Sequence, residues 1–499
     1  MAWTIRYRCF ALLALGAIVG RPVRAQEVGG HEAAGLEAVA AIEKVLVDTI
    51  ARNEKSVVAI ARVRKEQPGE NLQFEFRPDA FGRRLGQTSP LRPTDPNFVP
   101  NEYGTGVVVD RRGLILTAYH VLGEDSEYYV TTSERKVYAA SVKAADPRSD
   151  LAVLAIDATD LTPITLGDGA ALRKGQLVLT LGNPYAIARD GQASAGWGIV
   201  ANLARKIPPT LEESDAVGKR TLHHFGTLIQ TDAKLNIGTS GGPLLNLKGE
   251  MVGLCVALAA AAGYESAAGY AIPVDATFRR VLDMLKEGRE VEYGFLGIEL
   301  INLQPPETAA GLHGIKVERV WAGTPAARSG LKQDDIITAV DQTPLYDAEG
   351  LVLEVGKLPV EAVARLSVVR DGRPRLLDVR LSKYPVHGKK IVTNKPAAWR
   401  GMRVDYVSAL LETEQAAHSS PAYSDDAVVV SEVEEGTAAW QAGLRRGTLV
   451  SQVDRLAVRT PKEFQAAVAS KSGPGELRLA TEEPDAVRVV APAAKPAPR

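Results

Sequence analysis

The stretch Asn236-Ile237-Gly238-Thr239-Ser240-Gly241-Gly242-Pro243 decides how the rest of this chain is interpreted. Its three glycines surround one serine, and glycine adopts the backbone angles of a tight turn without steric cost. Such a turn can aim the backbone amides of Gly238 and Ser240 at one point, which is how an oxyanion hole is built. Taken in isolation, the stretch also fits an ordinary glycine turn between two strands with an incidental serine.

Two upstream segments carry side chains that would activate this serine. In Leu116-Thr117-Ala118-Tyr119-His120-Val121, a strand-like run ends and delivers a histidine onto a loop. In Ser149-Asp150-Leu151-Ala152-Val153-Leu154, a carboxylate directly precedes an apolar run, which places it at the mouth of a buried strand. Each feature alone is common in structural roles. The order histidine, aspartate, serine is that of the chymotrypsin architecture, and it differs from the order in subtilisins and α/β-hydrolases.

Together these residues supply every role of acyl transfer through a serine. Ser240 Oγ is a weak nucleophile at neutral pH and needs a base. His120, whose unperturbed pKa is near ~6.5, can take and return the proton, and Asp150 would fix the ring tautomer and stabilise the imidazolium. We therefore predict His120, Asp150 and Ser240 as catalytic residues, with the amides of Gly238 and Ser240 as the oxyanion hole.

Other titratable residues fit this chemistry less well. His223 and His224 lack a strand-end setting and a nearby partner, and Asp146 and Asp157 do not directly precede the apolar run. The seven histidines show no zinc-protease spacing, and the two cysteines form no ligand cluster. Glycine-rich phosphate loops are also absent from the sequence. We expect no metal and no cofactor.

Alternation of short runs predicts the fold class. Between residues 104 and 273, β-branched and Leu-rich runs alternate with Gly, Asn and Asp turns, and no helix-length periodic segment interrupts them. This pattern predicts antiparallel barrels rather than a parallel sheet. Helical spacing predicts helices over residues 33–53 and 275–290, with a strand over 56–63 and a long polar loop over 66–102.

The C-terminal part contains an internal repeat. The segment Gly323-Thr324-Pro325-Ala326-Ala327-Arg328-Ser329-Gly330-Leu331 recurs 113 residues later as Gly436-Thr437-Ala438-Ala439-Trp440-Gln441-Ala442-Gly443-Leu444. The same offset relates Asp341 to Asp454. A repeat of this length indicates two similar modules, and we expect Lys389–Lys395 to link them.

The composition and the N-terminal residues limit the classes of protein to which this chain can belong. Hydrophobic residues make up 45% and charged residues 24% of the 499 residues, which excludes a disordered chain, a collagen-like fibre and a multi-span membrane protein. Lys+Arg is 59 and Asp+Glu is 60, so no strong field favours nucleic acid. Residues 1–25 have a signal-peptide layout with no further membrane span expected. Their removal leaves Cys255 as the only cysteine, which suits export to a periplasm without disulfides.

The quoted motifs resemble the HtrA (Deg) serine proteases. The likeness covers roughly residues 45–479, and its further motifs are Gly104-Thr105-Gly106-Val107-Val108, Gly182-Asn183-Pro184, Ile229-Gln230-Thr231-Asp232-Ala233 and Gly269-Tyr270-Ala271-Ile272-Pro273. It implies a mainly β fold, a chymotrypsin-like double β-barrel followed by two PDZ domains. It also implies that the loop of Phe295, Leu296, Gly297 and Ile298 binds the C-terminal carboxylate of a peptide that adds a strand to the sheet edge. Trp399-Arg400-Gly401-Met402 holds the corresponding place in the second module.

The resemblance also sets the domain organisation that we expect. The segments are a signal peptide (1–25), a helix with the first strand and a long loop (26–102), the remainder of the protease domain (103–290), the first PDZ domain (291–388), the second PDZ domain (396–482) and a solvated tail (483–499).

Four features depart from the family pattern. Thr239 replaces the usual Asn before the serine and carries no charge for a zymogen-type ion pair, which favours control by loop reorganisation. Cys255 stands where Asn is common near the primary specificity pocket, and Arg400 replaces an apolar residue in the second PDZ loop. The segment Ala204–Gly226 is long. The P1 preference and ligand capture by the second PDZ domain therefore stay open.

Three functions remain to be distinguished. The first is an exported, ATP-independent endopeptidase that degrades unfolded envelope proteins, with PDZ domains that capture C-termini. The second is a PDZ adaptor or chaperone with a degenerate protease domain, and the third is a site-specific signalling protease activated by a peptide on a PDZ domain. The resemblance also implies trimers or multiples of trimers, with Leu36–Arg62 as a candidate contact.

Overall fold

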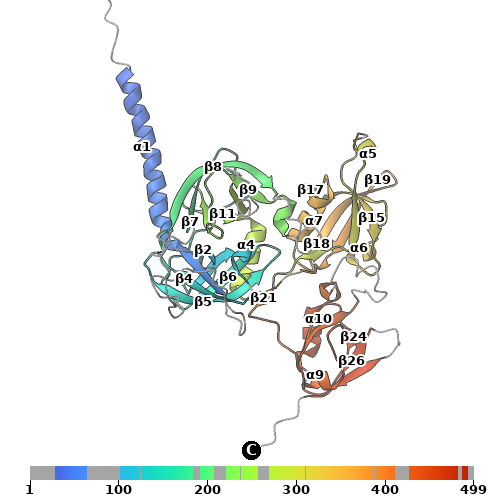
Figure 1. Cartoon of the computed structure of the whole chain (residues 1–499). Coiled ribbons are helices and arrows are strands. Elements are labelled where there is room, and N and C mark those ends of the chain that lie inside the picture. Colours follow the sequence, from blue (N-terminus) through green and yellow to red (C-terminus); the bar gives the residue numbers. More distant parts are fainter. Residues whose placement is uncertain are drawn as a thin grey trace, which may run out of the picture. The chain divides into compact units, whose positions relative to one another are not determined.

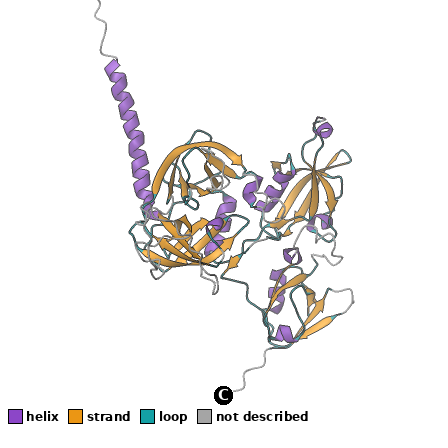
Figure 2. Ribbon diagram, viewed as in Figure 1, coloured by secondary structure: helices purple, strands orange, loops and turns teal. Residues whose placement is uncertain are grey.

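A computed structural model describes residues 28–64, 102–123, 125–183, 191–206, 221–236, 238–256, 269–309, 311–386, 389–410, 426–480 and 486–492. The predicted signal peptide and residues 66–101 of the predicted polar loop lie outside these ranges. Contacts divide the chain into two compact units, Met1–Asp48 and Thr49–Arg499. Strands dominate the described chain (Figures 1 and 2), which confirms the mainly β fold.

Helix α1 (Val28–Asn53) begins before the predicted start at residue 33 and leads through the 3-10 turn η1 (Glu54–Ser56) to the first strand. Its apolar side chains at Leu36, Val39 and Ile42 are 72, 62 and 48% exposed. Within the described residues, no helix is both long and apolar enough to cross a bilayer.

The first barrel contains six antiparallel strands. They are β1 (Val57–Arg64), β2 (Glu102–Asp110), β3 (Leu114–Ala118), β4 (Ser126–Thr131), β5 (Val137–Asp146) and β6 (Leu151–Ile156). Their order is β5-β4-β1-β2-β3-β6, and pairing of β5 with β6 closes the ring. Alternate side chains of each strand point into the barrel. The inward-facing side chains are aliphatic, as with the fully buried Ile115 and Leu154.

The second barrel is also closed and six-stranded. Its strands are β7 (Leu177–Gly182), β8 (Ser194–Arg205), β9 (Leu228–Thr231), β10 (Pro243–Leu245), β11 (Met251–Val256) and β12 (Gly269–Pro273), in the order β10-β11-β12-β9-β8-β7. The helix predicted over 275–290 is α4 (Ala276–Lys286), and the Asp275 side chain caps it by accepting from the Phe278 amide at 2.8 Å. The double barrel predicted from the sequence is confirmed.

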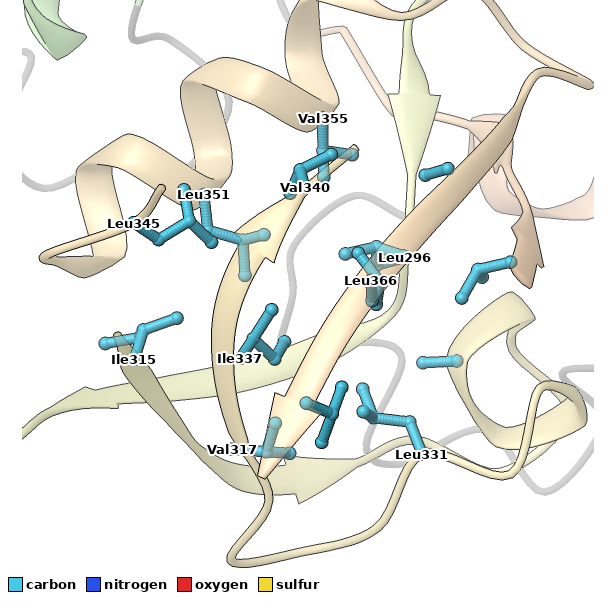
Figure 3. Packing of buried hydrophobic residues seen from close by; sticks show 14 of the residues in the cluster. Leu296, Ile315, Val317, Leu331, Ile337, Val340, Leu345, Leu351, Val355 and Leu366 are labelled. Carbon is cyan, nitrogen blue, oxygen red and sulfur yellow. The ribbon is translucent and has the colours of Figure 1, made fainter. Parts of the chain in front are cut away.

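The first repeated module has a five-stranded sheet, β14-β15-β16-β18-β19, with β17 paired to β16 and a two-stranded sheet β13–β20. Its elements are β13 (Gly294–Phe295), β14 (Ile298–Asn302), α5 (Pro305–Ala309), β15 (Ile315–Val320), α6 (Pro325–Arg328), β16 (Ile336–Val340), β17 (Thr343–Pro344), α7 (Ala348–Lys357), β18 (Val363–Arg370), β19 (Arg373–Arg380) and β20 (Ser382–Lys383). Leu351 and Val355 of α7 pack on the sheet residues Ile337 and Leu366 (Figure 3).

The second module repeats this strand order as β22-β23-β24-β26-β27, with β25 paired to β24. Its elements are β22 (Met402–Tyr406), the 3-10 turn η5 (Val407–Leu410), β23 (Val428–Val433), α9 (Ala438–Gln441), β24 (Leu449–Val453), β25 (Leu456–Ala457), α10 (Pro461–Val468), β26 (Gly475–Leu479) and β27 (Val487–Val490). The structure thus corrects the predicted solvated tail. Val487, Val489 and Val490 form an edge strand on β26, so the module extends beyond residue 482.

The expected linker Lys389–Lys395 also differs from the prediction. Strand β21 (Ile391–Val392) lies within it and pairs with β5 of the first barrel, through Ile391 with Ala145 and Val392 with Ala144. Thr393 Oγ1 adds a hydrogen bond to the Lys143 carbonyl at 2.7 Å. The segment between the two modules is therefore fastened to the protease domain rather than free in solvent.

Candidate active site

Strand pairing brings His120 and Asp150 together. In the antiparallel pair β3–β6, Ala118 lies opposite Leu151, so the residues that follow β3 and precede β6 leave the sheet at the same edge. The 3-10 turn η2 (Tyr119–Val121) carries the histidine. The Tyr119 amide donates to the Asp150 carbonyl at 2.9 Å, which fixes this turn against the segment that bears the acid.

The His120 ring lies against the Asp150 carboxylate. Nδ1 is 2.8 Å from Oδ2 and 3.1 Å from Oδ1, and the His120 amide donates to Oδ1 at 3.0 Å. Burial favours the neutral imidazole, but the charge of Asp150 and its hydrogen bond outweigh this effect and raise the pKa of His120. Burial also favours the neutral carboxyl, yet the His120 charge and hydrogen bonds hold the pKa of Asp150 below its usual value. The acid stays ionised and keeps the ring in place.

A second carboxylate, Asp146, supports the turn that carries Asp150. Asp146 Oδ2 accepts from the Ser149 amide at 2.9 Å, from Ser149 Oγ at 2.5 Å and from the Tyr293 hydroxyl. Asp150 itself has a φ of 55°, which is unfavourable for a residue with a side chain. The sequence set Asp146 aside, and the structure corrects this: Asp146 holds Ser149, so it fixes the turn that presents Asp150.

The serine turn is held between the two barrels by a threonine of β2. The Thr105 amide donates to the Ser240 carbonyl at 2.9 Å, and Thr105 Oγ1 donates to the Gly238 carbonyl at 2.7 Å. A Cβ at Gly241 would lie 2.1 Å from the Thr105 carbonyl oxygen and 2.4 Å from Thr117 Oγ1. Only glycine allows this approach to β3, which ends two residues before His120.

The residues before the serine form a closed turn. The Thr239 amide and hydroxyl both donate to the Asn236 carbonyl, at 3.0 and 2.6 Å, and Gly238 has a φ of 95°. Thr239 therefore stabilises the turn without a charge, in place of the ion pair that an acid would need. Gly238 and Ser240, whose amides are the predicted oxyanion-hole donors, lie two residues apart on this turn.

Sequence reasoning missed His223. It lies in the 3-10 turn η4 (Leu222–Phe225), where Nε2 is 2.8 Å from the Ser149 carbonyl and Nδ1 is 2.9 Å from Thr227 Oγ1. Its charge also lowers the pKa of Asp150. The prediction that His223 lacks a partner is wrong: Thr227 is four residues away, and Ser149 is 74 residues away in the sequence. The side chain of His224 and residues 207–220 of the segment Ala204–Gly226 lie outside the described part of the chain.

Cys255 faces the interior of the second barrel. Its side chain packs with Val178, Val200, Ile229 and Ala271, and burial raises its pKa to about 12. Its backbone amide and carbonyl bond to Gly242 and Gly241. Cys255 thus braces the serine turn through its main chain, and its thiol packs in the core.

The predicted carboxylate loop of the first module lies between β13 and β14. Gly297 has a φ of 80°, and a Cβ there would lie 2.4 Å from Thr324 Cβ. The Leu296 carbonyl accepts from the Ala326 amide at 3.0 Å, and its side chain belongs to the domain core (Figure 3). Beside the loop, a groove is lined by Phe295, Leu296, Gly297, Ile298, Leu300, Leu351, Val352 and Val355.

Two family models match the chain. A trypsin-like peptidase domain matches residues 104–254, and a PDZ domain matches residues 294–381. The first match begins within β2, ends within β11 and contains the three predicted catalytic residues. The second contains the carboxylate loop and the groove. Two independent family matches therefore identify a protease domain and a PDZ domain in this chain.

Several relatives share most of the chain. A probable periplasmic serine endoprotease DegP-like of Pseudomonas fulva (strain 12-X) is 32% identical over 409 residues, which is 80% of this chain and 81% of the relative. The protein of the same name from Chlamydia trachomatis serovar D is 28% identical over 438 residues, covering 85 and 82%. The solved HtrA-type protease AlgW with decapeptide is 26% identical, with a TM-score of 0.50, and covers 68% of this chain and 99% of that one. These likenesses, together with the two barrels and the PDZ sheet, establish that the chain belongs to the DegP-like, HtrA-type family of serine endopeptidases.

Proposed function

We propose that this endopeptidase cuts peptide bonds with Ser240 as nucleophile, His120 as general base and Asp150 as the residue that orients the imidazole. The observation that carries the proposal is the contact of His120 Nδ1 with both carboxylate oxygens of Asp150, at 2.8 and 3.1 Å. With Nδ1 engaged by the acid, Nε2 is the nitrogen that takes the serine proton.

The reaction proceeds in two acyl transfers. His120 accepts the proton of Ser240 Oγ as the oxygen attacks the scissile carbonyl, and the amides of Gly238 and Ser240 stabilise the resulting oxyanion. The imidazolium, stabilised by Asp150, then donates its proton to the leaving amine. Water attacks the acyl-enzyme by the same route and releases the acid product and free Ser240.

We infer that the substrates are unfolded or damaged proteins of the bacterial envelope. The relatives named above are called periplasmic, and residues 1–25 have the layout of a signal peptide. The apolar groove beside Phe295–Ile298 fits an extended C-terminal peptide added to the edge of β14. Unfolded chains offer free C-termini and extended segments, whereas folded proteins hide both.

A peptide-activated signalling protease is a second candidate. AlgW, which this chain resembles in fold, was solved with a decapeptide. If peptide binding to the first PDZ domain is needed for activity, then casein should be spared until a C-terminal peptide is added. Digestion of casein without added peptide supports the general protease instead.

We also propose that the protein assembles as a trimer or a multiple of trimers through the region Leu36–Arg62. The exposed apolar side chains of α1 favour contact with another copy, because several exposed apolar side chains at helical spacing on one helix mark an interaction surface. Light scattering should report at least three copies. A monomer at micromolar concentration would contradict the proposal.

Casein digestion by the purified full chain tests the catalytic assignment. Ser240→Ala should lower kcat by about five to six orders of magnitude, because the nucleophile is removed. Ser431→Ala is a matched control, since Ser431 lies on β23 of the second module, and it should keep full activity. Equal turnover by the Ser240→Ala protein would exclude this serine as nucleophile, and a chaperone or adaptor is favoured if the wild-type chain binds casein without cutting it.

A further inference from the structure

The groove of the first PDZ domain contains one side chain that belongs to the protease domain. Arg148, two residues before Asp150, lines the same groove as Phe295, Leu296 and Gly297. Its guanidinium carbon lies 3.6 Å from the ring centroid of Tyr384 and 5.3 Å from that of Tyr293. A cation from a distant part of the sequence is thus placed beside the loop that would receive a carboxylate.

Arg148 is buried, and among the described residues it has no salt-bridge partner. Only 3% of the residue is exposed, and its Nε makes no hydrogen bond. No carboxylate of the described residues forms a salt bridge with it. Burial raises the pKa of Asp146 against the opposing charge of Arg148, and its Oδ2 already accepts from Ser149 and Tyr293. A buried guanidinium with an open donor is costly and is the group that best matches a planar carboxylate.

The surroundings leave room for the guanidinium and hold its backbone. A Cβ at Gly356, in the last turn of α7, would lie 3.0 Å from Arg148 Nη2, so the glycine makes space at this end of the groove. The Arg148 carbonyl accepts from the Leu222 amide at 2.9 Å. Ser149, the next residue, is held by both Asp146 and His223. The arginine is therefore presented by a fixed turn rather than by a flexible surface loop.

We propose that Arg148 is the cationic half of a composite carboxylate site, with the loop Phe295–Ile298 as the other half. A C-terminal carboxylate that docks at this loop forms a charge-assisted hydrogen bond with the Arg148 guanidinium, while the apolar wall of Leu300, Leu351 and Val355 takes the last side chain. The proposal rests on the proposed peptide-binding role of the loop. It makes the first PDZ site complete only in the presence of the protease domain.

The test compares two probes on the full chain that carries Ser240→Ala, so that neither probe is cleaved. The probes are a fluorescein-labelled decapeptide with an apolar last residue and a free carboxylate, and the same decapeptide with a C-terminal amide. Fluorescence anisotropy gives the Kd of each, and the ratio of the two values is the carboxylate preference. Arg148→Met should lower this preference about tenfold to hundredfold, because one hydrogen bond to a charged group is lost.

Three further variants separate recognition from a structural role. Arg148→Lys keeps the charge and should retain part of the preference, whereas Arg375→Met, on the exposed face of β19, should retain all of it. Gly356→Ala suits a helix and should keep the fold, yet it crowds Nη2 and should reduce the preference without removing the charge. Differential scanning calorimetry of each variant reports its Tm.

The outcomes distinguish this proposal from the one on which it rests. If neither probe binds to the Ser240→Ala chain, the loop is no carboxylate site, and both proposals fail. If Arg148→Met and Gly356→Ala bind both probes with unchanged preference, the loop acts alone and the role of Arg148 is overturned. A lower Tm with an unchanged preference assigns Arg148 to packing against Tyr384, which also overturns the proposal.

Discussion

The two PDZ modules have the same strand order but differently closed loops at the predicted ligand site. In the first, the Leu296 carbonyl accepts from the Ala326 amide; in the second, the Arg400 carbonyl accepts from the Ala439 amide. Gly297 and Gly401 have φ values of 80 and 87°, and a Cβ on either would collide with a threonine of the repeat motif. The two loops therefore share the same backbone hydrogen bond to the repeat motif and the same positive-φ glycine.

The loop of the second module is closed on itself. Trp399 and Met402 exchange two backbone hydrogen bonds, at 2.8 and 3.0 Å, across a two-residue turn in which both Arg400 and Gly401 have positive φ. These are the angles of a tight hairpin turn. In the described residues of the first module, no such pair of bonds joins Phe295 to Ile298. The Met402 amide therefore donates to Trp399 within its own loop, whereas no such bond joins Ile298, at the corresponding place, to Phe295 in the described first module.

The side chain of Arg400 reinforces this closure. Its guanidinium donates to the carbonyls of Val490 and Gly473 and lies over the Trp399 ring, 4.6 Å from the centroid. Arg148 in the first groove, by contrast, has an unpaired Nε. Arg400 is hydrogen-bonded within its own domain, whereas the Nε of Arg148 makes no hydrogen bond. Sequence repetition therefore does not by itself repeat a binding site.

The largest expected difference concerns the two loop glycines. Gly297→Ala should weaken binding of the free-carboxylate decapeptide at least hundredfold, because the added Cβ and the positive φ force the loop to move. Gly401→Ala introduces the same strain and should leave peptide affinity unchanged. Both are measured by anisotropy in the Ser240→Ala chain.

Calorimetry provides the control for this pair. The two variants should lower Tm by comparable amounts, because each Cβ would lie 2.4 Å from its threonine Cβ. Peptide affinity that falls in Gly401→Ala and persists in Gly297→Ala would reverse the assignment of the ligand site.

The contact of His120 with Asp150 was predictable because each residue lies in a short, local motif. His120 and Asp150 each adjoin a strand with a strong apolar pattern, and pairing of those strands brings them together. The role of His223 was not predictable in this way. Its partner Ser149 is 74 residues away, and nothing in the sequence around either residue indicates their contact.

The repeat was predictable to the level of fold but not of loop conformation. The offset of 113 residues identified two modules, yet the closed turn depends on the conformation of Arg400, which its neighbours in sequence do not determine. Strands β21 and β27 were missed for a related reason. Both are short β-branched runs within Lys-, Pro- or Ala-rich segments, and pairing with β5 and β26 orders them.

Catalysis and peptide capture should separate in their pH dependence. In the proposed mechanism the neutral imidazole of His120 is the base, and its pKa is raised, so kcat/KM should fall about tenfold per pH unit below a midpoint above 6.5. Peptide affinity in the Ser240→Ala chain should change little between pH 6 and 8, since a peptide carboxylate stays ionised over this range and no histidine lines the groove. A parallel fall of both quantities would show that His120 also governs the groove.

The same pair has an opposite effect on stability. Because the folded-state pKa of His120 is raised, its pairing with Asp150 stabilises the fold fully below the unfolded pKa and loses this contribution as pH rises through the folded pKa. Activity should thus increase over the range in which this part of the stability declines. Asp150, whose pKa is lowered, loses its contribution only in acid, as pH falls through that lowered value.

The smallest expected effect is that of Arg400, which holds the place of Leu296 in the second loop. Leu296→Ala removes a core side chain and should cost about 2–5 kcal/mol within the first module. Arg400→Met removes hydrogen bonds at a half-buried site and should cost about 1 kcal/mol within the second. Hydrogen exchange with mass spectrometry localises each change: Leu296→Ala should expose β14 to β16, and Arg400→Met should expose β26 and β27. Faster exchange of β14 in the Arg400→Met protein would mean that the two modules fold as one unit, and the comparison between them would then concern a single cooperative structure.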